Sequence, residues 1–192
     1  RRLEKLNCDL DNFDLVISTH PFIHPICNSK TMMMLLDPIL HTAYMAKPRM
    51  DKYLSFWKND IEKAIKMGVP RGDIFYSGPL ARPKFYKENK TTNENIILVT
   101  AGGGWINKTE KFLIPILESF ENSEFKFVFV CGKNTRFYEN KSKKFEGNKL
   151  FKFLSWQNES EMASWIAKST AVLCFSIAQV SVEAGALKKP IF

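Results

Sequence analysis

The sequence predicts an α/β protein whose sheets consist of parallel strands. Short apolar runs typical of buried strands recur along the chain, and in residues 95–192 they alternate strictly with helical segments. In addition, small polar residues or glycines follow several of these runs, as in "DLVIST" and "ILVTAGGG". Strands of this kind, alternating with helices, are typical of parallel sheets that helices cover on both faces.

The first part of the chain supplies four expected strands and one expected helix. The "DLVIST" run at 14–19 ends in small polar residues, as buried strands often do. The segment "NDIEKAIKMG" at 59–68 predicts a helix, with Asn59 as its N-cap and Gly68 as its stop. The other expected strands of this part are 31–37, 52–56 and 73–78.

A polar segment then separates this part from a second series of elements. Residues 79–95, "PLARPKFYKENKTTNEN", are rich in Pro, Lys, Asn and Thr, which is typical of a linker. We expect one domain over 1–86, a linker over 87–94 and a second domain over 95–192. The expected strands of the second series are 95–101, 125–132, 149–154 and 171–176; the expected helices are 108–120, 134–145, 159–169 and 177–189.

The charge of the chain favours anionic partners. The 192 residues carry a net charge of +8, of which +5 lies in residues 1–90 and +3 in residues 91–192. Such a field attracts phosphates or an acidic lipid surface, although a Lys-rich composition that maintains solubility explains it equally well. No concentrated basic stripe or recognisable module points to nucleic acid, so we expect no nucleic-acid partner.

The cysteines and the apolar runs indicate a reducing compartment and no membrane span. The four cysteines lack metal-type spacing, and Cys131 and Cys174 lie in apolar runs where buried free thiols are expected. The longest apolar run, 32–36, is far too short to cross a bilayer, and no signal peptide is visible. Because the chain opens without Met and we expect Pro190 to lead into another strand, we expect a piece of a longer protein.

The three adjacent glycines, Gly102, Gly103 and Gly104, follow an expected strand and precede an expected helix. Glycines at this place allow a ligand to approach the backbone, and a helix N-terminus favours a phosphate. Two phosphate loops nearly match. Gly102 to Thr109 fits the P-loop pattern and Gly102 with Gly104 begins a dinucleotide fingerprint, but Asn107 replaces a required glycine in both.

A third interpretation rests on resemblance. Five stretches resemble the GT-B glycosyltransferases of the monogalactosyldiacylglycerol synthase, diacylglycerol glucosyltransferase and peptidoglycan UDP-GlcNAc transferase group, which is glycosyltransferase family 28-like. The stretches are "DLVISTHP" (14–21), "VPRGDIFYSGPLARPKF" (69–85), "ILVTAGGG" (97–104), "VFVCGKN" (128–134) and "VLCFSIAQVSVEAGALKKPI" (172–191). The resemblance implies two Rossmann-like parallel-sheet domains, an acceptor-side domain over 1–86 and a donor-binding domain over 95–192. Both are expected to be incomplete, the chain being truncated at both ends.

The resemblance also implies a site for a UDP-sugar on the second domain. Glu183 matches the position that hydrogen-bonds the ribose hydroxyls, and a carboxylate has the acceptor capacity for both. Leu154 and Ser155 match a loop that holds the nucleobase through its backbone. The residues expected at the diphosphate are Gly102, Gly103, Gly104, Ser176, Gln179 and Val180. Ser176 and Gln179 equally fit a helix capping box, and the family usually has a glycine pair near Ala178 and Gln179.

On the first domain, His20 and Asp37 are the candidates for the acceptor side. Both lie where an expected strand ends, and a general base must take the proton of the attacking hydroxyl. The family histidine on an N-terminal glycine loop has no counterpart in this chain. His20 and His24 are four residues apart, but the neighbouring prolines argue against a helix that would align them, so we expect no metal site.

The resemblance therefore implies a hexosyltransferase that moves a hexose from a UDP-sugar to a lipid hydroxyl such as that of diacylglycerol. The resemblance implies an inverting reaction that needs no metal or other cofactor. We expect a cytoplasmic protein, peripheral at the inner face of an anionic membrane. A non-catalytic nucleotide-binding or scaffold module of the same fold and a P-loop nucleotide hydrolase remain as alternatives.

Overall fold

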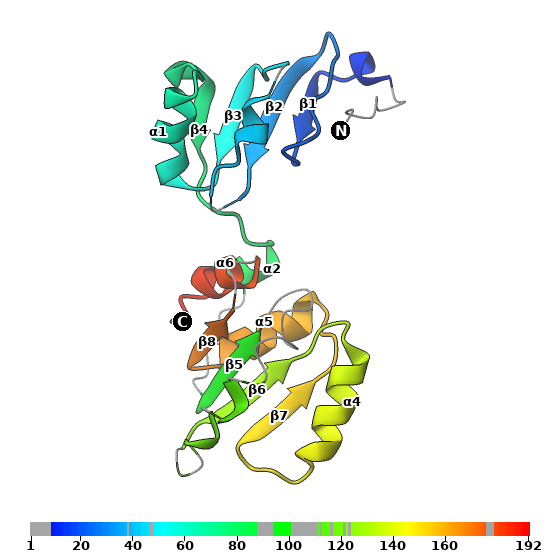
Figure 1. Ribbon diagram of the computed structural model, residues 1–192, viewed down its shortest axis with the longest axis vertical. Coiled ribbons are helices and arrows are strands. Elements are labelled where there is room, and N and C mark those ends of the chain that lie inside the picture. Colours follow the sequence, from blue (N-terminus) through cyan, green and yellow to red (C-terminus); the bar gives the residue numbers. More distant parts are fainter. Residues whose placement is uncertain are drawn as a thin grey trace. The chain divides into compact units, whose positions relative to one another are not determined.

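The computed structural model describes residues 9–37, 39–46, 48–87, 94–100, 111, 113–115, 117–120, 122, 124–175 and 179–192. The chain divides into two compact units, Arg1–Leu80 and Ala81–Phe192. Each unit contains one four-stranded sheet whose strands are all parallel (Figure 1). The units divide before residue 81, earlier than the expected domain boundary after residue 86.

The first unit arranges its strands in the order of the sequence. The order is β1-β2-β3-β4, formed by Leu15–Ser18, Lys30–Leu35, Lys52–Ser55 and Ile74–Tyr76. Short 3₁₀ helices cover Leu10–Asn12, Thr42–Met45 and Arg71–Asp73. The helix α1, Lys58–Lys66, connects β3 to β4 (Figure 1).

The helix α1 begins earlier than the sequence indicated, so the expected cap at Asn59 is wrong. Trp57 occupies the N-cap position in an extended conformation and makes no side-chain cap. Its indole N–H instead donates to the Leu36 carbonyl at 3.1 Å, which ties the start of the helix to the end of β2. The helix ends as expected at Gly68, whose φ of 90° favours glycine.

One face of the first sheet packs against a core and the other is half-exposed. Met33, Leu35 and Tyr53 point into a cluster that includes Tyr44 and Ala64. The opposite face carries apolar residues in register across all four strands: Ile17 pairs with Met32, Met34 with Leu54, and Leu54 with Phe75. Ile17 and Phe75 are 50% and 49% exposed. Parallel sheets are normally covered on both faces, so within the described residues this face lacks a cover.

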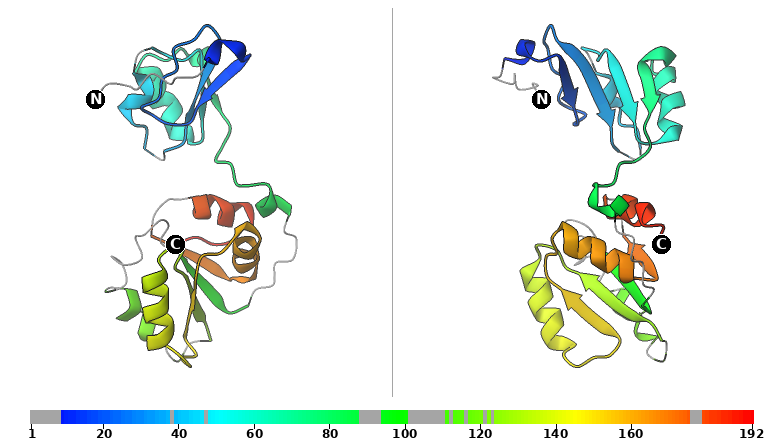
Figure 2. Two further views of the ribbon diagram at one scale, coloured as in Figure 1. Left: turned by 90° about the vertical axis from the view of Figure 1, so that its right-hand side faces the viewer. Right: turned by 180° about the vertical axis from the view of Figure 1, so that it is seen from behind.

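The second unit is a sheet in the order β7-β6-β5-β8 with helical segments on both faces. The strands are Phe151–Leu154, Lys126–Val130, Ile96–Thr100 and Ala171–Cys174, and the helices are α2 (Lys84–Lys87), α4 (Thr135–Lys144), α5 (Glu159–Lys168) and α6 (Gln179–Ala186). The described residues of 111–118 are also helical. Figure 2 shows α4 and α5 on opposite sides of the sheet.

Successive residues of each strand of this sheet point into different cores, because side chains alternate across a strand. Phe127 and Phe129 of β6 join one cluster with Leu113 and Phe137, whereas Val128 joins another. That second cluster, here called the α2–α5–α6 cluster, includes Phe85 of α2, Met162 and Ile166 of α5, and Ala184 of α6. Beyond β8, residues 190–192 hydrogen-bond along this strand, as expected for an extended segment after Pro190.

Of the two cysteines of the second unit, Cys131 is buried, as the sequence predicted, and Cys174 is half-buried. Burial raises the pKa of Cys131 to about 12 and also raises that of Cys174. Both are free cysteines and stay protonated near neutral pH.

The short helix α2 lies within the polar segment 79–95, whose composition is typical of a linker; residues 88–93 of the linker expected over 87–94 lie outside the described residues. Phe85 is fully buried in the α2–α5–α6 cluster, and Ala81 also belongs to it. Composition indicated a linker because the segment is polar on average, but the buried side chains of Ala81 and Phe85 pack it against the second unit. The segment is therefore part of the second unit.

This packing predicts that Phe85→Ala destabilises the second unit by about 3–5 kcal/mol, the usual cost of truncating a buried aromatic residue. Lys84→Ala, on the exposed side of the same helix, is the matched control and should change stability by less than about 0.5 kcal/mol. Urea unfolding with amide exchange of β5 assigns the loss to this unit. Equal stability of the two variants would contradict the packing.

Candidate functional site

The carboxyl ends of the four strands meet at one rim of the second sheet. Backbone hydrogen bonds connect the residues of this rim: Cys131 N–H donates to the Leu154 carbonyl at 2.9 Å, and Phe175 N–H donates to the Thr100 carbonyl at 3.2 Å. Ligands of open parallel sheets bind outside this edge. The loops after β5, β7 and β8, which carry the residues predicted for the donor, all leave from it.

Part of the predicted site lies outside the described residues. The predicted site residues that lie there are Gly102, Gly103, Gly104 and Ser176. The phosphate cradle and the proposed capping by Ser176 therefore stay predictions.

The loop after β7 is short and fixed at its far end. Leu154 is the last residue of β7 and packs against the α2–α5–α6 cluster, while Ser155 and Trp156 are exposed. A capping box then starts α5: Asn158 N–H donates to the Glu161 carboxylate at 2.8 Å, and Glu161 N–H donates to the Asn158 side chain at 3.0 Å. A loop held in this way presents the backbone of Leu154 and Ser155 at a defined place on the rim.

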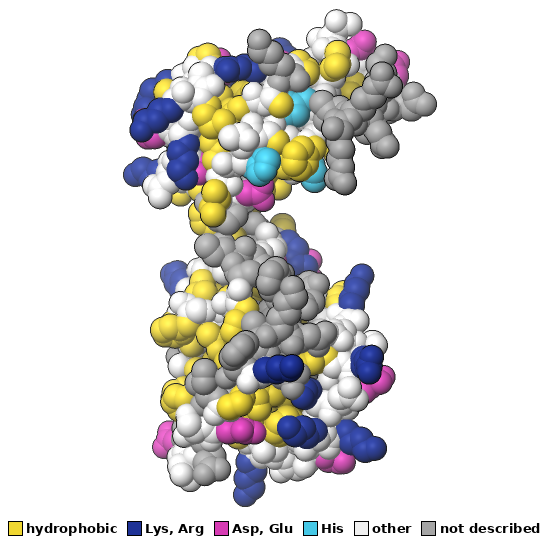
Figure 3. Space-filling view, viewed as in Figure 1, with side chains coloured by type: hydrophobic (Ala, Val, Ile, Leu, Met, Phe, Trp, Pro, Cys, Tyr) yellow, Lys and Arg dark blue, Asp and Glu magenta, His cyan; other side chains and the backbone are white. Residues whose placement is uncertain are grey.

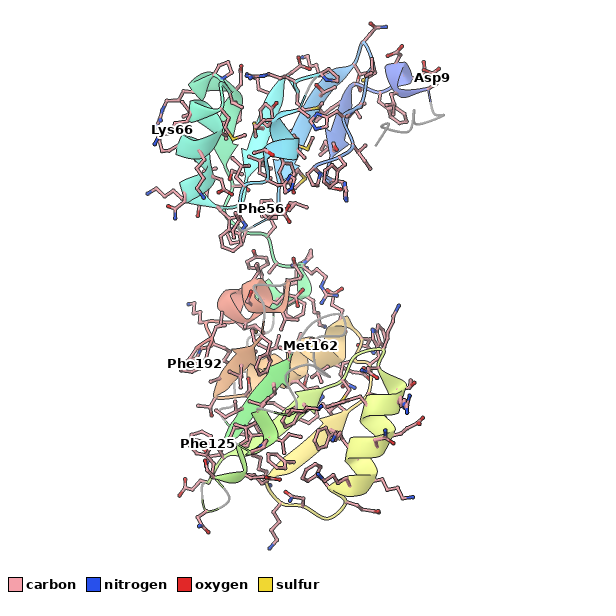
Figure 4. The ribbon with its side chains drawn as sticks, viewed as in Figure 1. Asp9, Phe56, Lys66, Phe125, Met162 and Phe192 are labelled. Atoms are coloured by element: carbon pink, nitrogen blue, oxygen red, sulfur yellow. The ribbon has the colours of Figure 1, made fainter. Side chains whose placement is uncertain are left out.

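The helix α6 brings the other predicted residues to one helical face. Glu183 is three residues after Val180 and four after Gln179, which places it beside each of them on the helix. Gln179 is exposed, Val180 is half-buried against the α2–α5–α6 cluster, and Glu183 is fully buried. Figure 4 labels Met162 of α5, which is a member of this cluster.

Glu183 is a buried carboxylate with one partnered oxygen. Its side chain has 0% exposure, and its Oε1 accepts a hydrogen bond from Arg82 Nε at 2.7 Å. The other oxygen, Oε2, is buried and has no hydrogen-bond partner among the described residues. A buried carboxylate oxygen without a partner is costly, so its presence in a rim helix points to a group that binds there.

Arg82, which sequence reasoning did not select, connects three parts of the second unit. In addition to its contact with Glu183, the Arg82 guanidinium lies 3.7 Å from the Glu159 carboxylate at the start of α5. It also lies over the Phe85 ring, 5.0 Å from the ring centroid. The hydrogen bond with Glu183 raises the pKa of Arg82. The only sequence signal was its place in a stretch that resembles the family, because its main partner lies 101 residues away.

The acceptor-side candidates both lie where strands end in the first unit. His20 follows β1 and is exposed, and its Nδ1 accepts from Phe22 N–H at 3.3 Å. Asp37 follows β2 and is also exposed, and its Oδ2 accepts from the hydroxyl of the buried Tyr44 at 2.8 Å. No hydrogen bond joins these two described residues to each other.

His24 has a structural environment. Its Nδ1 lies 3.1 Å from the Pro48 carbonyl, and its Nε2 lies 2.8 Å from the Ala43 carbonyl and 3.1 Å from the Pro21 carbonyl. Both ring nitrogens are thus occupied by backbone carbonyls, which connects the loop after β1 to the 3₁₀ helix at Thr42–Met45.

A groove of about 840 Å³ lies elsewhere on the second unit. Asn95, Lys126, Asn148 and Lys149, which line it, stand at the amino ends of β5, β6 and β7. This is the end of a parallel sheet opposite to the usual ligand edge. We therefore assign the candidate site to the carboxyl rim and to Glu183.

No protein-family model matches this chain, and no curated protein matches it. Solved structures do. The UDP-GlcNAc 2-epimerase from Methanocaldococcus jannaschii superposes with a TM-score of 0.57 at 15% identity, covering 85% of this chain and 54% of the epimerase. Anabaena HepE in complex with UDP and glucose gives 0.52 at 12% identity, covering 93% and 58%. The lipopolysaccharide outer core galactosyltransferase WaaB gives 0.50 at 15% identity, covering 93% and 55%.

These likenesses confirm the fold class that the sequence predicted, two Rossmann-like α/β units of the GT-B type. At such low sequence identity, these similarities establish only the fold. Membership of glycosyltransferase family 28 stays a prediction. The chain spans just over half the length of these three structures.

Tyr44 predicts an alkaline pH dependence of stability. Burial, and then the hydrogen bond to Asp37, raises the pKa of Tyr44 from 10.0 to about 12. The unfolded chain therefore loses this proton first, so the free energy of unfolding should fall between about pH 10 and pH 12, by roughly 2–3 kcal/mol.

Urea unfolding of the wild type and of Tyr44→Phe across this range measures the effect. The free energy of unfolding of Tyr44→Phe should lack this fall between about pH 10 and pH 12. If the free energies of the wild type and the variant fall in parallel with pH, the role of Tyr44 is refuted.

Proposed function

We propose that this protein uses a UDP-sugar and transfers its hexose to a lipid hydroxyl. The observation that carries the proposal is Glu183, a fully buried carboxylate whose Oε2 is left without a partner on a helix that follows β8. Two vicinal ribose hydroxyls are donors that such an oxygen can accept from. The sequence resemblance assigns this position to ribose binding, and the named structural neighbours include proteins solved with UDP, UDP-GlcNAc or glucose.

The other parts of the donor site follow from the rim. The backbone at Leu154 and Ser155 would hold the uracil, and the glycines 102–104 with the start of α6 would hold the diphosphate. Backbone N–H groups and a helix N-terminus stabilise the negative charge that develops on the leaving diphosphate, and this arrangement needs no bound metal. Gln179, the first residue of α6, and Val180 would line the same place.

The acceptor would meet the first unit. A general base must remove the proton of the attacking hydroxyl, and the exposed carboxylate of Asp37 is the proposed helper. The Tyr44 hydroxyl holds one of its oxygens at 2.8 Å, which fixes the carboxylate at the end of β2. The exposed His20 would contact the acceptor.

Binding of UDP without metal tests the donor site. Calorimetric titration of the wild type with UDP in EDTA should show binding, and Glu183→Gln should weaken it about 10- to 100-fold, because the loss of a charged hydrogen-bond acceptor costs about 1.5–3 kcal/mol. Glu139→Gln, an exposed carboxylate on α4, is the matched control and should bind UDP like the wild type.

Other outcomes of the titration favour the alternatives. Binding of ATP only with magnesium would favour a P-loop hydrolase, and binding of neither nucleotide would favour a scaffold module. With a UDP-hexose and diacylglycerol vesicles, a transferase releases UDP and forms a glycolipid. Appearance of a second UDP-sugar without any acceptor would instead indicate an epimerase, the reaction named for the neighbour with a TM-score of 0.57.

We also propose that the first unit docks on an anionic membrane. Exposed Lys58, Lys63 and Lys66 lie along α1, and together with Arg71 they line a groove of about 630 Å³. Figure 3, in the same view as Figure 1, shows Lys and Arg side chains on the side of the first unit where α1 lies. Phe75 and Tyr76 of β4 are about half exposed. Basic residues near an acidic bilayer contribute about 1 kcal/mol each. No helix in the described part of the chain is long and apolar enough to span a bilayer.

Vesicle sedimentation at low salt tests this docking. The wild type should bind phosphatidylserine vesicles, and reversing Lys58, Lys63 and Lys66 to Glu should weaken binding at least tenfold. Reversing Lys133, Lys143 and Lys144, which are exposed at α4, is the control and should have a smaller effect. An equal loss in both triple variants would refute docking through α1.

A further inference from the structure

Arg82 stands at the junction of three elements of the second unit. It precedes α2, and its guanidinium contacts Glu183 of α6 at 2.7 Å and Glu159 of α5 at 3.7 Å. Its side chain is 45% exposed, whereas that of Glu183 is fully buried. The charge of Glu183 is therefore neutralised from the solvent side, by a residue that belongs to a different segment of the chain.

The contact between Arg82 and Glu183 uses only one carboxylate oxygen. Arginine commonly binds a carboxylate with two parallel hydrogen bonds that occupy both oxygens. Here Nε donates to Oε1 alone, and Oε2 stays buried without a partner among the described residues. The contact thus fixes the carboxylate through Oε1 and leaves Oε2, which is buried, as an acceptor without a partner among the described residues.

We propose that Arg82 is a positioning residue that fixes the Glu183 carboxylate through Oε1 and directs its Oε2 to the ribose of the bound nucleotide. This inference rests on the proposed function, because it presumes that a uridine nucleotide binds at α6. It assigns to the segment before α2 a role in selecting a ribonucleotide over a 2′-deoxyribonucleotide. Arg82 acts through Glu183 and need not touch the ligand.

A purely structural role for Arg82 predicts a different result. The guanidinium also lies over the Phe85 ring and near Glu159, so it could simply hold α2 against α5. In that case replacing Arg82 would weaken the binding of UDP and of 2′-deoxy-UDP equally, or would change neither affinity. The ratio of the two affinities separates positioning from general stability.

The experiment is calorimetric titration of the full chain with UDP and with 2′-deoxy-UDP. The wild type should prefer UDP by about tenfold or more, as expected for a hydrogen bond to a charged acceptor. Glu183→Gln and Arg82→Gln should both reduce this preference to less than about threefold. Arg82→Lys should retain an intermediate preference, because it keeps the charge but not the Nε geometry.

Glu159→Gln is the matched control, since it removes the other carboxylate beside Arg82 and leaves the contact with Glu183. It should keep the full preference for UDP. Melting temperatures show which variants are folded, and if Arg82→Gln is not, Arg82→Lys carries the test.

The outcomes distinguish the two proposals. A wild type that does not prefer UDP refutes ribose binding by Glu183, and the role of Arg82 falls with it. Suppose that the wild type prefers UDP and that Glu183→Gln loses this preference, as expected. If folded Arg82→Gln then keeps the full preference for UDP, only the positioning role of Arg82 is refuted. Full preference in Arg82→Lys, where that variant carries the test, refutes it as well.

Discussion

The half-buried ion pair between Arg82 and Glu183 constrains the rim of the second unit. Glu183 is fully buried beside an apolar cluster, and burying a carboxylate is costly unless a cation and hydrogen bonds accompany it. Arg82 supplies the cation and a hydrogen bond to Oε1 of Glu183. This contact requires that the segment carrying Arg82 lies against α5 and α6. The burial of Phe85 in the α2–α5–α6 cluster keeps that segment in place. The packing of α2 therefore determines where Arg82 meets Glu183 in the candidate site.

The two sheets differ in how they are covered. The second sheet has a core on each face, which leaves its carboxyl rim as the place where polar groups can meet a ligand. The first sheet has a core on one face, and its other face carries the half-exposed Ile17, Met32, Met34, Leu54 and Phe75. Tyr44 belongs to this one core, and its hydroxyl donates to Asp37, which gives the Asp37 carboxylate a defined position.

The order of strands and helices could be predicted because it depends on local periodicity, which β6 and α5 show clearly. The sequence could not indicate that residues 84–87 form a helix, since this depends on one buried aromatic ring and not on composition. It also placed the cap of α1 at Asn59, whereas the indole of Trp57 sets the start through a contact with Leu36. Glu183 was found through resemblance, but its partner Arg82 is 101 residues distant, and only the folded chain brings the two together.

The central claim is that Glu183 Oε2 is a ligand-binding oxygen, and a crystal structure of the protein with UDP tests it most directly. The account predicts that a ribose hydroxyl lies within about 3 Å of Oε2, a normal hydrogen-bond distance, while Arg82 Nε still contacts Oε1. A nucleotide bound elsewhere, or an Oε2 that remains without a ligand partner in the complex, would contradict it.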